Sequence, residues 1–591
     1  MTYSAKLAEL TPTPCQLAII TLDYCSLAYG VGACTASGGA GSECYNTYPT
    51  CQDKVNFAKT TKDYKFTSHE SPLPFGTGER PYIKSISYLP TEIKTSLTVK
   101  GRISLEMADE PDTDIGIDPY VANRSSVTGL FWKKLIARNP NFKGRALKLY
   151  DGFYGLAESD FTTDGKLFTG IIDNITLNPK SNTVKIEAVD ILKKLDDIYI
   201  PAKLSIKLAS DISAAQTSVT LVNSDVSSLD SPTGYVRIDD EIIYYGAINT
   251  TTKIISSCGR GIFSTTADTH SASTKVQPVK YYTEDNPFDM MQTILADAGI
   301  AAGDIDSTAF DNEEAFISDI NVMAVIAEPT KASVLYYELV DLLGCKTWVS
   351  ESLKITIARN LPNHPSRTYT SLSDDENILE GSCSVNLNLE TIGDNDGATF
   401  ITRCSIYWDM PDITASLDEG TSYNRITIAL DTDAEGTNEY NIESEKVIKS
   451  RWINMAVTAT EEEVDSWVTA IAMRQVWQHR DPQPTLSMEV ALKDAELLTG
   501  EYAEITTDKL CNADGSDLSA ENFQVVKRER KEGKIALTCL RLCSKKVCYF
   551  SSSGDAAPDY TSATAAEKEK YGYFTGTDSM MSDDTYGYMY F

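Results

Sequence analysis

Four cysteines within 27 residues constrain the fold of this 591-residue chain more than any other sequence feature. They are spaced Cys25-x8-Cys34-x9-Cys44-x6-Cys51, and the stretch between them is rich in Gly, Ala and Ser, as in Ser37–Ser42. Little apolar periodicity runs through this stretch. A segment that buries little apolar surface cannot offset the conformational entropy that it loses on ordering. Something other than a hydrophobic core must therefore order these residues.

The four thiols are a ligand set that suits zinc or an iron–sulfur cluster. The set contains no CxxC pair, and its spacing differs from common ferredoxin spacings. Buried free thiols and disulfides therefore stay open beside a [4Fe–4S] cluster and zinc. Cys15 lies beside the apolar run Leu17–Ile20, so we expect it to belong to a strand in the core.

Composition excludes several classes of protein. The chain has 53 Lys and Arg against 84 Asp and Glu, which gives a formal charge of −31. Such a chain repels phosphate backbones and is a poor candidate for wrapping nucleic acid. With four His residues it is also unsuited to a His-based metal centre. No run reaches the ~20 apolar residues of a membrane span, and the N-terminus lacks a signal-peptide core. We expect a soluble protein made in a cytosol, with its 13 cysteines reduced, buried or ligating.

Patterning predicts a mainly β chain with α/β parts. Strand alternation marks residues 93–107 and 183–189, and helical periodicity marks residues 288–298. We divide the chain into a cysteine-rich segment (1–60), a first β-barrel domain (61–205), a small inserted β domain (206–280), an α/β domain (281–375), a second β-barrel domain (376–550) and an extended tail (551–591).

Local signals place the helices. Asn286-Pro287 predicts a helix start, and Gly299 predicts its end. A second helix is predicted with Ser333 as its N-cap, followed by a hairpin over 345–358. The longest helix is expected over 460–478.

The chain shows no catalytic signature. It contains no HExxH, GxSxG, GxxxxGK[ST] or GxGxxG motif, so we do not expect an enzyme. The stretch from Asp431 to Gly436 begins like a calcium loop, but Ile442 stands at the twelfth position, where a bidentate Glu is required. We expect a solvated turn there.

Three groups of segments resemble the central tail-tip or baseplate hub proteins of long-tailed bacteriophages and gene transfer agents. The first group resembles the first hub barrel and comprises Phe131–Pro140, Leu149–Gly152 and Phe168–Asp173. The second resembles a domain inserted into many hubs and comprises Tyr235–Ile243, Gly259–Gly261 and Thr265–His270. The third resembles the ending of gene-transfer-agent-like hubs and comprises Pro558–Ala563, Tyr571–Phe574 and Met581–Tyr588.

The resemblance implies a structural virion protein at the tail tip, assembled in the cytoplasm of the bacterial host. Such hubs are homotrimers whose two barrel domains per chain form a six-domain ring continuous with the tail tube. The implied partners are the distal tail protein ring, the tape-measure protein and tail-fibre or tail-tip proteins. DNA would pass through the lumen without specific binding, and contact with the host envelope is a further implication.

The cysteine segment resembles a different tail component, a minor tail protein of lambdoid siphophages that carries a [4Fe–4S] cluster. Carried over, the ligands are Cys25, Cys34, Cys44 and Cys51, with zinc or no metal as the alternatives and Cys15 as a substitute ligand. Two other functions remain open from sequence: a tail-associated enzyme degrading glycan or peptidoglycan, and an iron–sulfur redox protein.

Overall fold

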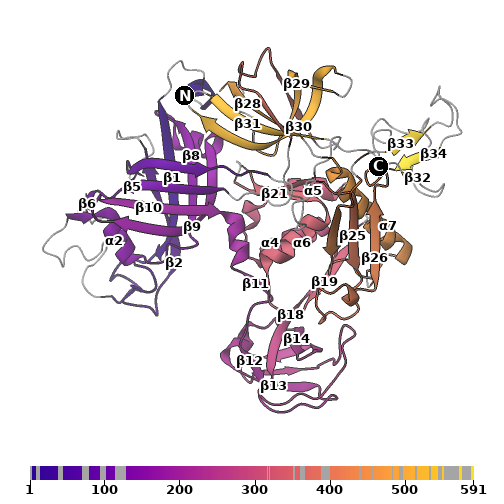
Figure 1. Ribbon diagram of the computed structural model, residues 1–591. Helices are drawn as coiled ribbons and strands as arrows, with labels where there is room; N and C mark the ends of the chain where they lie inside the picture. The colour runs from indigo at the N-terminus through magenta and orange to yellow at the C-terminus, as the bar shows by residue number, and fades with distance from the viewer. Residues whose placement is uncertain are drawn as a thin grey trace.

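A computed structural model describes most of the chain. The described residues are 3–7, 13–36, 44, 46–68, 79–93, 101–113, 128–315, 317, 320–350, 353–359, 367–387, 400–437, 439, 441–455, 457–481, 484–491, 497–512, 515–531, 534–542, 549–550, 571–574 and 587–590. The predicted fold class is confirmed: the structure is mainly β, with helices placed among several sheets (Figure 1).

The first β unit is an eight-stranded sheet in the order β3-β2-β1-β8-β9-β10-β5-β4. Alternating apolar residues explain its strands, since Val184, Ile186 and Ala188 of one strand are all buried. The helix α2 packs Phe131 and Trp132 into the same core. The bounds are α1 Tyr3–Leu7, β1 Pro14–Cys25, β2 Lys59–Thr67, β3 Glu79–Arg80, β4 Ile83–Leu89, β5 Arg102–Ala108, β6 Pro111–Thr113, β7 Thr128–Leu130, α2 Phe131–Arg138, β8 Ala146–Phe153, α3 Glu158–Asp164, β9 Lys166–Asn178 and β10 Thr183–Asp190.

The inserted unit has its own core and projects from the molecule at the bottom of Figure 1. Its strand β18 (Lys275–Asp285) is long, because it pairs with β14 at one end and with β19 (Val322–Ile326) of the next unit at the other. The remaining strands are β12 Ile206–Leu208, β13 Ser218–Val222, β14 Gly234–Ile238, β15 Glu241–Tyr245, β16 Ala247–Asn249 and β17 Ile254–Ser256, and β11 Tyr199–Ile200 precedes them and pairs with Thr330 and Lys331 of the next unit. The shared strand β18 joins the inserted unit to the α/β region.

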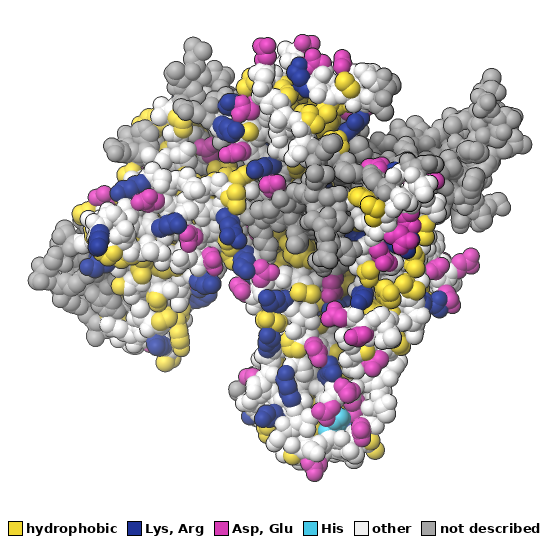
Figure 2. All heavy atoms as spheres, viewed as in Figure 1, with side chains coloured by type: hydrophobic (Ala, Val, Ile, Leu, Met, Phe, Trp, Pro, Cys, Tyr) yellow, Lys and Arg dark blue, Asp and Glu magenta, His cyan; other side chains and the backbone are white. Residues whose placement is uncertain are grey.

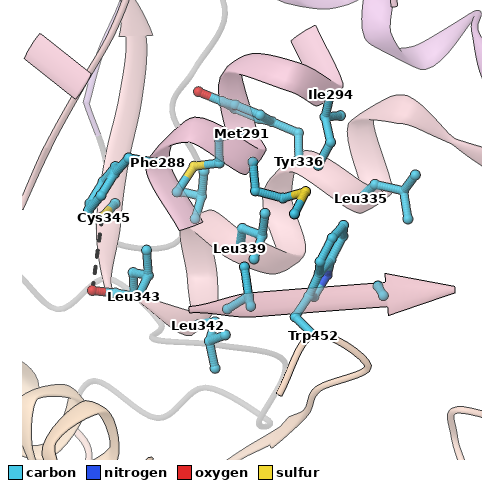
Figure 3. Packing of buried hydrophobic residues seen from close by; sticks show 14 of the residues in the cluster. Phe288, Met291, Ile294, Leu335, Tyr336, Leu339, Leu342, Leu343, Cys345 and Trp452 are labelled. Carbon is cyan, nitrogen blue, oxygen red and sulfur yellow. Dashed lines mark hydrogen bonds between the residues drawn. The ribbon is translucent and has the colours of Figure 1, made fainter. Parts of the chain in front are cut away.

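The α/β region forms the largest core. Asn286 caps α4, accepting a hydrogen bond from Phe288 N at 3.0 Å, and Gly299 ends it with φ +71°, as predicted. Figure 3 shows Phe288, Met291 and Tyr336 packed around the core that Trp452 also enters. The bounds are α4 Pro287–Asp297, α5 Ser307–Glu314, β20 Thr330–Lys331, α6 Ala332–Leu342, β21 Cys345–Val349 and β22 Ile355–Arg359.

Part of the predicted second barrel belongs to this core instead. The sheet β26-β25-β27 packs against α7, which begins at its N-cap Thr460 with a capping box to Glu463. The bounds are β25 Arg403–Trp408, β26 Arg425–Leu430, β27 Glu445–Lys449 and α7 Glu461–His479.

The second β unit is a six-stranded sheet in the order β23-β29-β30-β31-β28-β24. Its bounds are β23 Tyr369–Ser373, β24 Ser384–Leu387, β28 Pro484–Ala491, β29 Tyr502–Cys511, β30 Asp517–Lys531 and β31 Lys534–Arg541. Three short strands of the C-terminal part pair with one another: β32 Tyr549–Phe550, β33 Tyr571–Phe574 and β34 Gly587–Tyr590.

The two β units meet although they lie at opposite ends of the chain. Ile93 N donates to Val526 O at 2.8 Å. Trp348 of β21 is buried between them with Ile93, Val526 and Leu540. This cluster, which we call the junction, fixes the first sheet against the second beside the α/β region.

The structure differs from the sequence predictions at three points. Within the described residues, no pairing joins the end strands β3 and β4, or β23 and β24, so the predicted barrels are open sheets here. Ser333 lies inside α6 and is buried, and Lys331 is the N-cap. The boundary at residue 60 divides the β1–β2 hairpin, since Cys25 pairs with Lys59.

Candidate functional site

The predicted cysteines lie on the connection between two paired strands. Cys25 is the last residue of β1, and Lys59 opposite it is the first of β2. Residues 26–58 therefore connect the two paired strands, and we call this connection the loop. Ser26 N donates to Ala58 O at 2.9 Å and joins the two ends of the loop, and Cys25 N donates to Asn46 O, farther along it, at 3.1 Å.

The loop gathers the four predicted thiols. Cys25, Cys34 and Cys44 are buried, Cys51 is half-buried, and all four are free. Burial raises the pKa of Cys44 to about 11, and the nearby thiols of Cys25, Cys51 and Cys34 raise it further against the N–H of Asn46. Burial also raises the pKa of Cys51, with Cys25 and Cys34 adding to the effect. Each thiol thus lies within electrostatic reach of others in the set.

Backbone amides point at two of the sulfurs. Asp53 N lies 3.3 Å from Cys51 Sγ and donates to it, and the backbone N–H of Asn46 donates to Cys44. In both cases the donor is two residues after the cysteine. Such hydrogen bonds favour the thiolate form, which is the form that binds a metal.

The donor set fits a thiolate-bound metal or cluster, although its geometry is not that of a coordinated centre. Within the described residues, no group of three or more His, Cys, Asp or Glu is placed as ligands of one ion. Cys25 and Cys44 nevertheless lie together with Tyr29 in one small apolar cluster of the loop. The raised pKa values of Cys44 and Cys51 favour their protonated thiols. A bound cation would reverse this, because coordination deprotonates a thiol.

Cys15 is not part of this group. It is fully buried in a different cluster, with Leu17, Phe153 and Phe161. Ten residues of extended β1 separate it from Cys25, which corresponds to about 33 Å. The structure therefore places Cys15 in the core, as predicted, and away from the other four.

The sequence did not predict a role for Asp53 in this loop. Asp53 accepts hydrogen bonds from Thr35 N at 2.8 Å and from Asn56 Nδ2 at 2.9 Å, which hold the pKa of its carboxyl at about 2. The only sequence signal for it is its position two residues after the last cysteine.

The inserted unit contains a second polar group, centred on the buried Glu241 of β15. Its carboxylate accepts from Arg260 Nε at 2.7 Å and from Arg260 Nη2 at 2.6 Å. His270 Nε2 lies 2.8 Å from it, and His270 Nδ1 lies 2.8 Å from Asp239. Burial opposes the charge of Glu241, but these partners outweigh it and lower its pKa. The segments around Arg260 and His270 therefore form a buried polar cluster with Glu241 that stabilises the inserted unit.

The calcium-like stretch is a turn, as expected, but the side chains of Asp431 and Glu435 are not solvated as predicted, since they are 11% and 13% exposed. Asp431 accepts from Ala434 N at 2.9 Å and from Arg480 Nε at 2.6 Å. Glu435 forms a bidentate pair with Arg403 at 2.8 and 2.7 Å. These carboxylates are engaged by arginines.

The surface charge is mixed. On the face shown in Figure 2, Asp and Glu side chains are interspersed with Lys and Arg over the described residues. Among the described residues, no helix combines the length and apolar character needed to cross a bilayer.

Comparisons with known proteins give only distant similarity. No family model matches the chain, and no curated protein matches it. Among solved structures, the tail protein from Neisseria meningitidis MC58 is similar with a TM-score of 0.32 and 10% identity, covering 77% of this chain and 91% of that one. The 43 kDa tail protein of prophage MuSo2 from Shewanella oneidensis has a TM-score of 0.30 and 11% identity, with coverages of 78% and 94%. A chain of the native gene transfer agent virion has a TM-score of 0.28 and 11% identity, with coverages of 81% and 90%. TM-scores of this size do not establish a shared fold.

Proposed function

We propose that the chain is a non-enzymatic structural protein of a phage-type tail tip, a homotrimeric hub that joins the tail tube and tape-measure protein to a receptor-binding fibre. The junction carries this proposal. Two β units from opposite ends of the chain lie side by side, held by the Ile93–Val526 hydrogen bond and the buried Trp348. Three copies of such a pair supply six sheet units, the number that a hub ring continuous with a tail tube requires.

An exposed apolar strand supports a role inside a larger assembly. Ile426, Ile428 and Leu430 of β26 are 46%, 52% and 38% exposed, and Val447 of β27 is 46% exposed. The pairing of β26, β25 and β27 puts these side chains on one face, opposite the face that α7 covers. Hydrophobic side chains gather over β25 and β26 in Figure 2. Contiguous exposed apolar side chains typically mark contact sites with other proteins.

We further propose that Cys25, Cys34, Cys44 and Cys51 hold a [4Fe–4S] cluster, with zinc as the alternative metal. Bound there, the group would cross-link the arms of a loop that has little apolar core. The loop presents Val31, Tyr48 and Val55 to solvent, at 44%, 54% and 94% exposure. A rigid loop with apolar side chains at its surface suits docking to a neighbouring tail protein better than electron transfer.

The oligomeric state tests the hub. Sedimentation of the full chain at micromolar concentration is expected to give three times the chain mass of 64.9 kDa. A stable monomer or dimer would contradict the hub.

Anaerobic purification followed by iron, sulfide and zinc analysis tests the metal centre independently. About four irons and four sulfides per chain are expected for the cluster. One zinc per chain would retain the cross-link with a different metal.

A further inference from the structure

We propose that Asp53 is the positioning residue of the cysteine centre: it connects the Cys34 and Cys51 arms of the loop and fixes both sulfurs relative to each other. This role depends on the metal centre proposed above.

The contacts of Asp53 converge on one carboxylate oxygen. Oδ2 accepts from Thr35 N at 2.8 Å, from Thr35 Oγ1 at 2.9 Å and from Asn56 Nδ2 at 2.9 Å. Asp53 is 9% exposed, whereas Thr35 and Asn56 are exposed, so these hydrogen bonds are partly buried at the surface of the loop. Thr35 directly follows Cys34 in the chain. The carboxylate therefore anchors the residue beside one predicted ligand.

The backbone of the same residue reaches the other ligand. Asp53 N donates to Cys51 Sγ at 3.3 Å. Asp53 thus binds Thr35, the neighbour of Cys34, through its side chain and the sulfur of Cys51 through its main chain. Tyr29 Oη also donates to Gln52 Oε1, at 3.0 Å, in the same part of the loop.

This arrangement has two consequences for a bound metal. Residues that orient ligands typically change metal affinity 10- to 100-fold when they are removed. In addition, a fixed anion beside a thiolate ligand disfavours adding an electron to the centre. A residue that merely stabilised the loop would produce the first effect through unfolding but would not produce the second.

The test uses the full-length, metal-free, reduced chain, titrated with Co²⁺ and followed through the sulfur-to-cobalt charge-transfer bands. Asp53→Ala is expected to weaken Co²⁺ binding 10- to 100-fold, and Asp53→Asn, which keeps the shape and one acceptor oxygen, is expected to weaken it less. Asp63→Asn is the matched control. Asp63 lies on β2 of the same hairpin and accepts from Thr21 Oγ1 at 2.7 Å in an exposed pair. This variant should bind as the wild type does.

Chain reconstituted with iron and sulfide gives a second readout, which remains usable if Asp53→Ala fails to fold. Loss of the charge in Asp53→Asn should shift the reduction midpoint potential of the centre to more positive values, and Asp63→Asn should leave it unchanged. Wild-type affinity in Asp53→Ala, or a wild-type potential in Asp53→Asn, would overturn the positioning role and leave the metal centre standing. Wild-type chain that gives no cobalt–thiolate bands would instead overturn the centre itself.

Discussion

Replacing Trp348 by Ala should separate the two β units. Trp348 is 4% exposed and packs with Ile93, Val526 and Leu540, which are 3%, 5% and 3% exposed. Truncating a buried Trp to Ala typically costs about 3–5 kcal/mol, because the lost burial is followed by a cavity. Since every 1.4 kcal/mol is a factor of ten, opening of the junction should become about 10²- to 10⁴-fold more frequent.

Hydrogen exchange at the Ile93 amide measures this opening directly, because that amide donates to Val526 O across the junction. Faster exchange by the same factor is expected in Trp348→Ala. Trp348→Phe should show a smaller effect, since the indole N–H has no hydrogen-bond partner among the described residues.

The control is Ile238→Ala, which truncates a fully buried side chain in the separate core of the inserted unit. It should destabilise that unit and leave exchange at Ile93 unchanged. Unchanged exchange at Ile93 in Trp348→Ala, or equal acceleration in both variants, would refute the view that the Trp348 contact holds the two units together.

Three further outcomes are expected. Cys44→Ser should abolish metal content in anaerobically purified protein, whereas Cys15→Ser should leave it at the wild-type value, because Cys15 lies in a different cluster; equal losses would disprove the assignment of ligands. The lowered pKa of Glu241 means that its stabilising effect is complete above its ordinary pKa of 4.5 and is lost as pH falls through the lower folded-state value. Acid unfolding of the inserted unit, followed by exchange of its amides, should therefore lose this pH dependence in Glu241→Gln, which should also cost about 3–5 kcal/mol by leaving a buried cation unpaired; retention of the dependence would contradict this role. Finally, Gly500→Ala should cost about 2–4 kcal/mol in chemical unfolding, because its φ is +93° and a Cβ would lie 2.0 Å from Cζ2 of Trp348; a neutral result would show that this contact yields freely.

Sequence predicts elements well where the signals are local. The start of α4 follows from Asn286-Pro287, and the approximate extent of α7 follows from its periodicity after Thr460. Each depends on contacts within one or two turns. The prediction for Ser333 was wrong because serine is a favourable capping residue, whereas the fold buries Ser333 as the second residue of α6, where the helix packs on the core.

The larger arrangement depends on contacts that sequence does not reveal. β1 pairs with β2 beyond a 33-residue loop and with β8, more than 120 residues away. The sheet of β25 to β27 lies in the predicted second barrel, yet it packs in the core with α4 and α6. Alternation identifies which residues of a strand face inward, but not which strand lies beside it.

The candidate site was only partly predictable for the same reason. The clustering of Cys25, Cys34, Cys44 and Cys51 in the sequence identified them as candidate ligands. Their proximity in the fold depends on the pairing of Cys25 with Lys59, which closes the loop. Asp53 could not be found from its residue type, because aspartates are common and its partners Thr35 and Asn56 become neighbours only in the folded loop.

Electron microscopy of the purified full-length chain tests the proposed hub most directly. Class averages should show a closed ring of three chains, with six sheet units around one central opening and three inserted units projecting from it. Isolated single chains at concentrations where the protein is folded, or rings in which the two β units of a chain do not lie side by side, would contradict the proposed function.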